Sequence, residues 1–288
     1  KVFCHEDKCK EQFDELNDRL EDSSLHAVFY SSLVNPCTRF LNSIVYAIVA
    51  LCGALVCFHT GGAALLQQRT NCRLYLTEPY APGDFPEINT ALLFGAHPPK
   101  PLRTKFFLAQ SARYEPVETA PLPEGMRLVR LDGHAFAQLG VCTPDDIWFL
   151  GDAVASEHTF DKYKLTYLYD VEKFLATLDT VANLRGKRFI PAHVAPFEDA
   201  ASVVERNRRW VYETGDCIVG LLQAPQTFET LLKAIFDRYD LQMTFGQHTL
   251  LGATVRAFLT WLMDAGRVSY FCEDNLLYWK AAEAGEGQ

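Results

Sequence analysis

The sequence predicts a mixed α/β fold in which short strands alternate with longer helices. Three short runs rich in apolar residues are predicted to be strands: 126–131, 146–150 and 188–190. Between the last two, residues 170–183 carry apolar residues at helical spacing, with Asp170 as the N-cap and Gly186 expected to close the helix. A third observation is that histidines and an aspartate follow these runs. Loops at the ends of strands often present functional side chains.

The composition is that of an ordinary globular protein. The chain has 288 residues, enough for one large or two ordinary domains, with 49% hydrophobic and 22% charged residues. Its net charge of −9 should repel nucleic acid and anionic surfaces, so no nucleic-acid partner is expected. Nine cysteines without framework spacing, and no recognisable signal peptide, indicate a reduced, cytoplasmic setting.

The first predicted part, residues 1–57, differs in character from the rest. Residues 6–22 are rich in acidic side chains with apolar residues at helical spacing, and residues 40–58 contain no charge. Because about twenty apolar residues can span a bilayer, 40–58 is a candidate membrane segment. A helix buried in a soluble core explains the same pattern. Membrane association of this otherwise cytoplasmic chain therefore remains open.

This N-terminal part resembles the permease region of ABC exporters. The resemblance rests on Phe13-Asp14-Glu15-Leu16-Asn17 and on FYSSLVNPCTRFLNSIVYAIVALCGAL, and it covers about the first 55 residues. It implies a helical extension that leads into a transmembrane helix. No GxxxxGK[ST] phosphate-binding loop occurs in the sequence, so these residues offer no ATPase chemistry.

The second predicted part is a domain of residues 58–200. It begins with HTGGAALLQQRT, which favours a helix, followed by a strand in NCRLYL. Residues 78–123 hold nine of the fourteen prolines and are expected to form an irregular insertion. The three strands and the helix described above complete this domain.

The third part, residues 201–288, is predicted to be mainly helical. Helices are expected at 201–214, 227–239 and 246–264, with a hairpin formed by 267–270 and 276–278. This order of helix, helix and hairpin is winged-helix-like. Residues 226–288 carry five Lys and Arg against eight Asp and Glu, which favours packing or dimerisation over nucleic-acid binding. The oligomeric state stays open.

Four residues form a candidate metal site: His59, His134, Asp152 and His193. Imidazole nitrogens and carboxylate oxygens are ligands that suit zinc or another borderline divalent ion. A lone histidine is more often an ordinary loop residue, so the candidate depends on the four residues together.

The pattern resembles the metallo-β-lactamase superfamily of metallohydrolases. The motifs are HTGGAALLQ, DGHAFAQLGV, DDIWFLGDAV and IPAHVAP, which together cover about 140 residues. The resemblance implies part of an αββα sandwich and zinc-dependent hydrolysis of a small-molecule substrate. Asp152 and His59 would be the catalytic residues.

The first motif departs from the family pattern HxHxDH. His59 matches its last histidine, whereas Phe58 occupies the aspartate position and Val56 and Ala54 the two earlier histidine positions. The resemblance implies that the missing aspartate orients the attacking water, so weakened activity is expected. The departure coincides with the change in character near Cys57, where a junction between two unrelated segments is a simple explanation.

The resemblance also assigns the remaining ligands to two metal positions. One position keeps His59, Asp152 and His193, which is the usual number of protein ligands at a catalytic zinc. The other keeps only His134 and the shared Asp152, so one zinc ion is expected and the second position is degraded. Lys162 to Lys164 and Tyr167 either line a pocket for an anionic substrate or belong to a solvated helix.

Three functions remain open. The first is a zinc hydrolase, intact or weakened. The second is a catalytically silent remnant or fusion, and the third is a fragment of an ABC-type membrane transporter whose functional part is 1–57. His97 and His158 fit no motif and are expected at the surface, and His248 is expected in a cap or in packing.

Overall fold

The computed structural model of the protein describes residues 60–77, 99–104 and 112–282. The predictions for residues 1–57, and for the membrane segment at 40–58, lie outside these ranges. Within them, no helix combines the length and apolar character that crossing a membrane requires.

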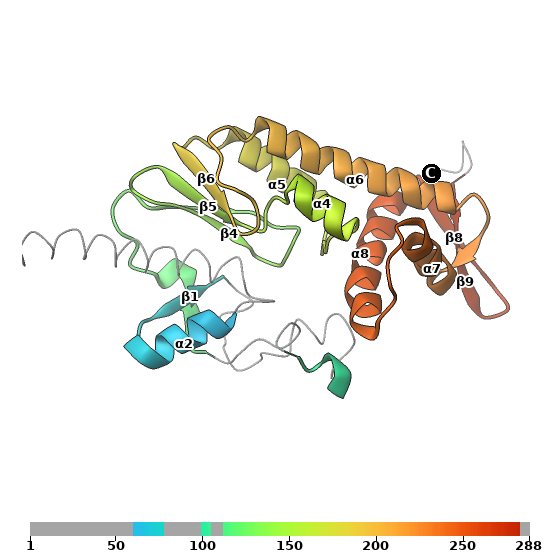
Figure 1. Ribbon diagram of the computed structural model, residues 1–288, viewed down its shortest axis with the longest axis horizontal. Helices are drawn as coiled ribbons and strands as arrows, with labels where there is room; N and C mark the ends of the chain where they lie inside the picture. The colour runs from blue at the N-terminus through green and yellow to red at the C-terminus, as the bar shows by residue number, and fades with distance from the viewer. Residues whose placement is uncertain (1–59, 78–98, 105–111, 283–288) are drawn as a thin grey trace, which may run out of the picture. The chain divides into compact units, whose positions relative to one another are not determined.

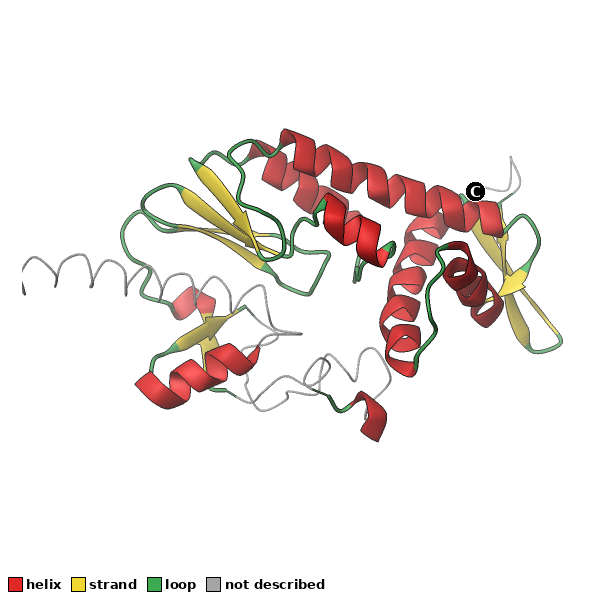
Figure 2. Ribbon diagram, viewed as in Figure 1, coloured by secondary structure: helices red, strands yellow, loops and turns green. Residues whose placement is uncertain are grey.

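Within the described residues the strands form three sheets (Figure 2). The first is a parallel pair, β1 (Leu74–Leu76) and β2 (Tyr114–Pro116). The second contains, in spatial order, β3 (Arg127–Arg130), β4 (Leu139–Cys142), β5 (Ile147–Gly151) and β6 (Arg188–Pro191). The third has the order β7-β9-β8, with β7 (Gln226–Thr227), β8 (Val268–Glu273) and β9 (Leu276–Ala281).

The helices lie between and after these strands. They are α2 (Thr60–Thr70), α4 (Glu157–Tyr163), α5 (Val171–Asn183), α6 (Ala201–Leu221), α7 (Phe228–Arg238) and α8 (Phe245–Asp264). Two 3₁₀ turns, η1 (Lys100–Leu102) and η2 (Val117–Thr119), flank β2 in the chain.

The four-stranded sheet changes direction once, and this positions the site. β3 pairs with β4 and β4 with β5 in antiparallel fashion, whereas β5 and β6 are parallel. A parallel pair needs a crossover connection, and α4 and α5 supply it. Because parallel strands point the same way, the loops that follow β5 and β6 emerge at the same edge of the sheet.

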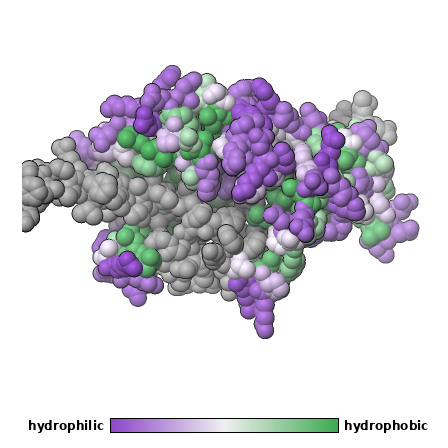
Figure 3. Space-filling view, viewed as in Figure 1, coloured by the Kyte–Doolittle hydropathy of each residue, from purple (hydrophilic) through white to green (hydrophobic). Residues whose placement is uncertain are grey.

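One continuous cluster of buried residues joins this sheet to the C-terminal helices. Trp148 and Leu150 alternate on the buried face of β5, and Phe174 and Leu178 of α5 belong to the same cluster. The cluster continues through α6 and α8 as far as Val268. Fully burying a large apolar side chain stabilises the fold by about 1.5–3 kcal/mol. Helices α5 and α6 lie side by side (Figure 1), and hydrophilic residues cover much of the outer surface over α6 (Figure 3).

Most of the predicted elements are confirmed. The strands at β3, β5 and β6 and the helices α2, α5, α7 and α8 lie where the sequence places them. The Asp170 side chain caps α5 by accepting a hydrogen bond from the Lys173 N–H, at 3.0 Å. Helices α7 and α8 precede the β8–β9 hairpin, which is the expected order of helix, helix and hairpin.

Two interpretations of local structure were wrong. Residues 78–123 are not irregular throughout, because 114–116 form β2 and 117–119 form a 3₁₀ turn. Helix α6 continues to Leu221 rather than stopping at Thr214, because its buried face extends through Ile218. The sequence reading also did not include strand β4 or helix α4.

The expected role of Gly186 was also wrong. Helix α5 ends at Asn183, before this glycine. A Cβ atom at Gly186 would lie 2.6 Å from Cδ1 of Trp148 and 2.9 Å from the Asp146 carbonyl oxygen. The missing side chain therefore makes room for the Trp148 indole, which donates a hydrogen bond to the Arg185 carbonyl oxygen at 2.9 Å.

Candidate functional site

Asp152 and His193 are brought together by the parallel pairing of β5 and β6. Each residue follows its strand directly or by one residue, and Gly151 lies opposite Pro191 across an irregular register. The Ala192 N–H donates to the Gly151 carbonyl oxygen at 2.8 Å, which ties the two strand ends together. As a result, Nε2 of His193 lies 3.5 Å from Oδ1 of Asp152.

His134 reaches the same carboxylate from the loop between β3 and β4. Its Nε2 atom lies 3.8 Å from Oδ2 of Asp152. The preceding Gly133 has a φ of +118°, and a Cβ there would lie 2.3 Å from the backbone nitrogen of Phe174. The Gly133 carbonyl oxygen accepts hydrogen bonds from the N–H groups of Tyr169 and Asp170, at 2.8 and 3.0 Å. Glycine thus allows this loop to pack on the start of α5, which places His134.

The surroundings of His134 favour its neutral form. Burial lowers its pKa, and the Asp152 charge and a backbone hydrogen bond at Tyr167 oppose that shift. The Tyr167 ring meets the imidazole edge-on, with centroids 5.6 Å apart. Neutral imidazole is the form that binds a metal ion. A hydrogen bond from the imidazole to backbone is also the usual support of a metal-binding histidine.

The two imidazoles therefore lie on opposite oxygens of one carboxylate. The Asp152 side chain is 14% exposed and that of His134 21%, whereas that of His193 is 61% exposed. The site is thus open to solvent on the His193 side. A carboxylate flanked in this way can be shared between two metal positions.

Among the described residues, no group of three or more His, Cys, Asp and Glu side chains could hold a metal ion. The geometry explains why: each oxygen of Asp152 faces one imidazole, so an ion bound at either oxygen would have only two ligands among the described residues. His59, the expected third ligand beside Asp152 and His193, lies outside the described residues. The donor atoms suit zinc or a similar ion in kind, and in number they fit only as part of a larger ligand set.

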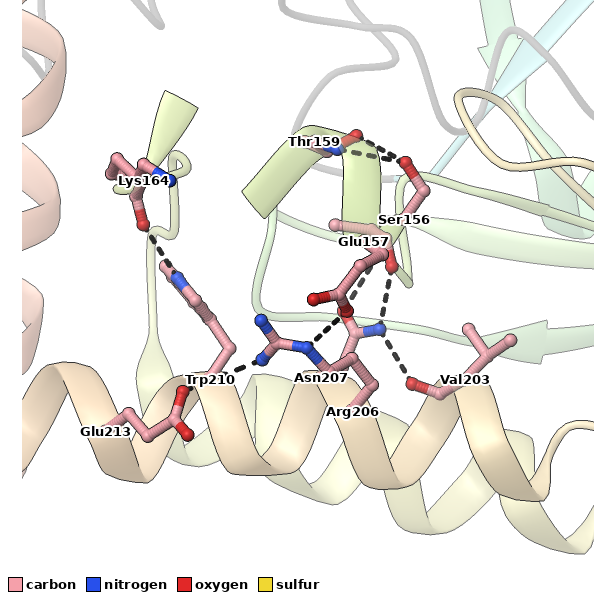
Figure 4. A network of polar contacts seen from close by, with 10 residues as sticks. Ser156, Glu157, Thr159, Lys164, Val203, Arg206, Asn207, Trp210 and Glu213 are labelled. Carbon is pink, nitrogen blue, oxygen red and sulfur yellow. Dashed lines mark hydrogen bonds and ion pairs between the residues drawn. The ribbon is translucent and has the colours of Figure 1, made fainter. Parts of the chain in front are cut away.

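The loop of residues 152–156, which begins with Asp152, is held by α6 (Figure 4). Oδ1 of Asn207 accepts a hydrogen bond from the Ala155 N–H at 2.8 Å. Nδ2 of Asn207 donates to the carbonyl oxygens of Ala155 and Val203, at 2.9 and 2.8 Å. Ser156 then caps α4 by accepting a hydrogen bond from the Thr159 N–H at 3.1 Å.

A second contact joins α4 to α6 beside this loop. Arg206 forms an ion pair with Glu157, and its guanidinium lies 4.8 Å from the centre of the Phe160 ring. The Arg206 contact lowers the pKa of Glu157. Both helices therefore constrain the chain immediately after Asp152.

The sequence reading did not identify Gly133 or Asn207. The sequence does mark Asn207, because it is a polar residue on the same helical face as the buried Val204 and Val211. Such a residue needs buried hydrogen-bond partners. For Gly133 the sequence shows only that it precedes His134, because its close contact with Phe174 arises from packing in the folded chain.

The other residues singled out from the sequence have different positions. Tyr167 contacts His134, whereas 162–164 are exposed and the Lys162 ammonium lies 4.7 Å from the centre of the Tyr163 ring. His158 is exposed, as expected, and His97 lies outside the described residues. His248 contacts Glu229 through Nε2 at 2.9 Å, which joins α7 and α8 and agrees with a packing role.

A family model and solved structures are similar to parts of this chain. The family profile of the ABC transporter transmembrane region matches residues 1–62, less than a quarter of the chain. No curated protein sequence matches.

Two solved structures share the fold of much of this chain. One is a metallo-β-lactamase family protein from Thermus thermophilus, with 18% identity, a TM-score of 0.52 and coverage of 73% of this chain and 72% of that one. The other is a β-lactamase domain protein from Burkholderia ambifaria, with 17% identity, a TM-score of 0.50 and coverage of 73% and 65%. The chain thus spans slightly less than two thirds of the second structure. At these identities the likeness shows the fold, and the chain has the metallo-β-lactamase fold.

Proposed function

We propose that this chain is a metal-dependent hydrolase of a small-molecule substrate, with zinc as the metal. The observation that carries the proposal is the placement of His134 and His193 on opposite oxygens of Asp152, at 3.8 and 3.5 Å. The exposed side of His193 gives a small molecule access to the same carboxylate. The metallo-β-lactamase fold supports the reaction class but leaves the substrate open.

Each predicted ligand has a distinct role in this proposal. His193 and Asp152, together with His59, would hold one ion, and His134 with the shared Asp152 would form a second, weaker position. A bound zinc ion activates water and polarises the bond to be broken. Asp152 and His59 are the proposed catalytic residues, because with His193 they would hold the ion at the position that has three protein ligands.

Weakened activity follows from the first motif. Phe58 has no side-chain atom that accepts or donates a hydrogen bond, so it cannot orient an attacking water. Orientation of the reacting groups contributes a large part of enzymatic rate enhancement. We therefore expect slow hydrolysis by a cytoplasmic protein, with no nucleic-acid partner.

Metal content tests the proposal directly. The full chain, purified without chelator, is expected to carry about one zinc ion per chain, and His193→Ala is expected to lose it together with any hydrolytic activity. His158→Ala is the matched control, because this histidine is exposed on α4 and outside the site. A folded, zinc-free unaltered chain that takes up no added zinc would contradict the proposal and favour a catalytically silent remnant.

A second candidate function, part of a membrane transporter, is favoured by the family match at residues 1–62. It predicts that the full chain binds phospholipid vesicles through 40–58. Val49→Arg, which places a charge within that apolar stretch, is then expected to release the chain from the vesicles. Equal flotation of both chains, or none of either, would remove this candidate.

A further inference from the structure

A buried side-chain amide from a distant helix holds the chain after Asp152. Asn207 is fully buried on α6 and lies 52 residues from Ala155 in the sequence. It satisfies both the N–H and the carbonyl oxygen of Ala155. Two hydrogen bonds to one residue set the position and the orientation of that peptide segment.

The loop 152–156 has few degrees of freedom left once these bonds form. Ala153 and Val154 are buried in the main core, and the Ala153 N–H donates to the Leu150 carbonyl oxygen at 3.2 Å. The Ala155 bonds to Asn207 close the loop at its other end. Asp152 lies beside these anchors, with each of its oxygens facing one imidazole.

We propose that Asn207 is a positioning residue for the metal site, which holds the loop 152–156 so that Asp152 faces both His134 and His193. The inference rests on the proposed function, since it assigns Asn207 a role in metal binding. Supporting residues of this kind typically contribute about 10- to 100-fold to metal affinity. Asn207 acts through three residues of backbone, so a loss of about tenfold is expected when it is removed.

An apolar side chain at this position cannot replace Asn207. Removing the Asn207 amide leaves the N–H and carbonyl groups of Ala155 without these hydrogen-bond partners in a half-buried loop. The loop must then open for these groups to reach water. The Val203 carbonyl oxygen loses one donor as well, but it belongs to the regular backbone of α6. The predicted disturbance is therefore concentrated in 152–156 rather than spread over α6.

The test compares two variants of Asn207 with a control in the same helix. Asn207→Ala removes all three hydrogen bonds. Asn207→Asp keeps the size of the side chain and the acceptor for the Ala155 N–H and loses the two bonds that Nδ2 donates, which provides a second variant should the alanine variant fail to fold. Thr214→Val is the control, because Thr214 is also buried, about two turns further along α6, and its hydroxyl is hydrogen-bonded to Tyr239, outside the loop.

Two quantities are measured on the full chain. Hydrogen–deuterium exchange of peptides covering 152–156 reports on the loop without metal, and competition with a chelator gives the zinc affinity. We expect faster exchange of 152–156 and about tenfold weaker zinc binding in the Asn207 variants. For Thr214→Val we expect neither faster exchange nor weaker zinc binding, even if its unfolding temperature falls as far as that of the Asn207 variants.

The outcomes separate this inference from the proposed function. Unchanged exchange of 152–156 in both Asn207 variants overturns the inference, whatever the metal does. Faster exchange with unchanged zinc affinity also overturns it, because the loop would then not position Asp152. If exchange is faster in the Asn207 variants but the unaltered chain binds no zinc, Asn207 does hold the loop, and the metallohydrolase proposal is rejected.

Discussion

Replacing Gly133 with alanine is expected to destabilise the fold strongly and to displace His134. The new Cβ would lie 2.3 Å from the backbone nitrogen and 2.4 Å from the Cα of Phe174, in the first turn of α5. Backbone atoms at the start of a packed helix cannot rotate away as a side chain can. The φ of +118° adds strain for any residue with a side chain.

The magnitude follows from these two costs. An unfavourable backbone conformation costs about 1–3 kcal/mol, and overpacking of a well-packed interior costs about 1–3 kcal/mol more. The Gly133→Ala variant is therefore expected to lose about 2–6 kcal/mol in the free energy of unfolding. Movement of this loop also weakens the hydrogen bonds from Tyr169 and Asp170 to the Gly133 carbonyl oxygen.

Urea unfolding of the full chain measures this loss, with Gly220→Ala as the matched control. Gly220 lies within α6, and a Cβ there would meet no atom within 4 Å. Alanine is favoured over glycine in a helix by about 0.5–1 kcal/mol, so the control should be as stable as the original chain or more so. A Gly133→Ala variant that unfolds with the stability of the control would refute the packing argument.

Three further changes test other parts of the structure. Phe258→Ala, at a fully buried position of α8, is expected to cost about 3–5 kcal/mol in thermal unfolding, and the exposed Tyr270→Ala, which loses a cross-strand contact with Trp279, less than about 1 kcal/mol. Asp170→Ala removes the side-chain acceptor of the Lys173 N–H at the start of α5, and a loss of about 1 kcal/mol is expected in denaturant titration. Burial, and after it a hydrogen bond with Cys217, raises the pKa of Tyr239, so the unfolded chain ionises this phenol first and stability falls as the pH rises above about 10. Tyr239→Phe is expected to flatten that fall; an unchanged slope between about pH 9 and 11 would show that Tyr239 does not contribute.

The sequence alone was sufficient for those elements whose cause is local. The N-cap at Asp170 and the apolar spacing of 171–183 identify α5, because both signals act within a few residues. The candidate ligands could be placed for a related reason, since His134, Asp152 and His193 each follow a predicted strand. The edge of the sheet at which they meet depends only on strand direction.

The sequence also identified the resemblance of the N-terminal part to an ABC exporter permease, and the family match at 1–62 agrees with that resemblance. It could not assign β4, because this strand is buried on both faces and lacks the alternation that marks a half-exposed strand. Helix α4 spans only seven residues, too few for a clear periodic pattern.

Tertiary structure alone decided how the site is supported. Gly133 packs on Phe174, Gly186 makes room for Trp148, and Asn207 holds Ala155, and each pair is separated by tens of residues. Such contacts leave no periodic trace in the sequence, because each depends on two surfaces that meet only after the chain has folded. For the same physical reason, four candidate ligands could be named from their order, whereas the oxygen of Asp152 that each imidazole faces required the folded chain.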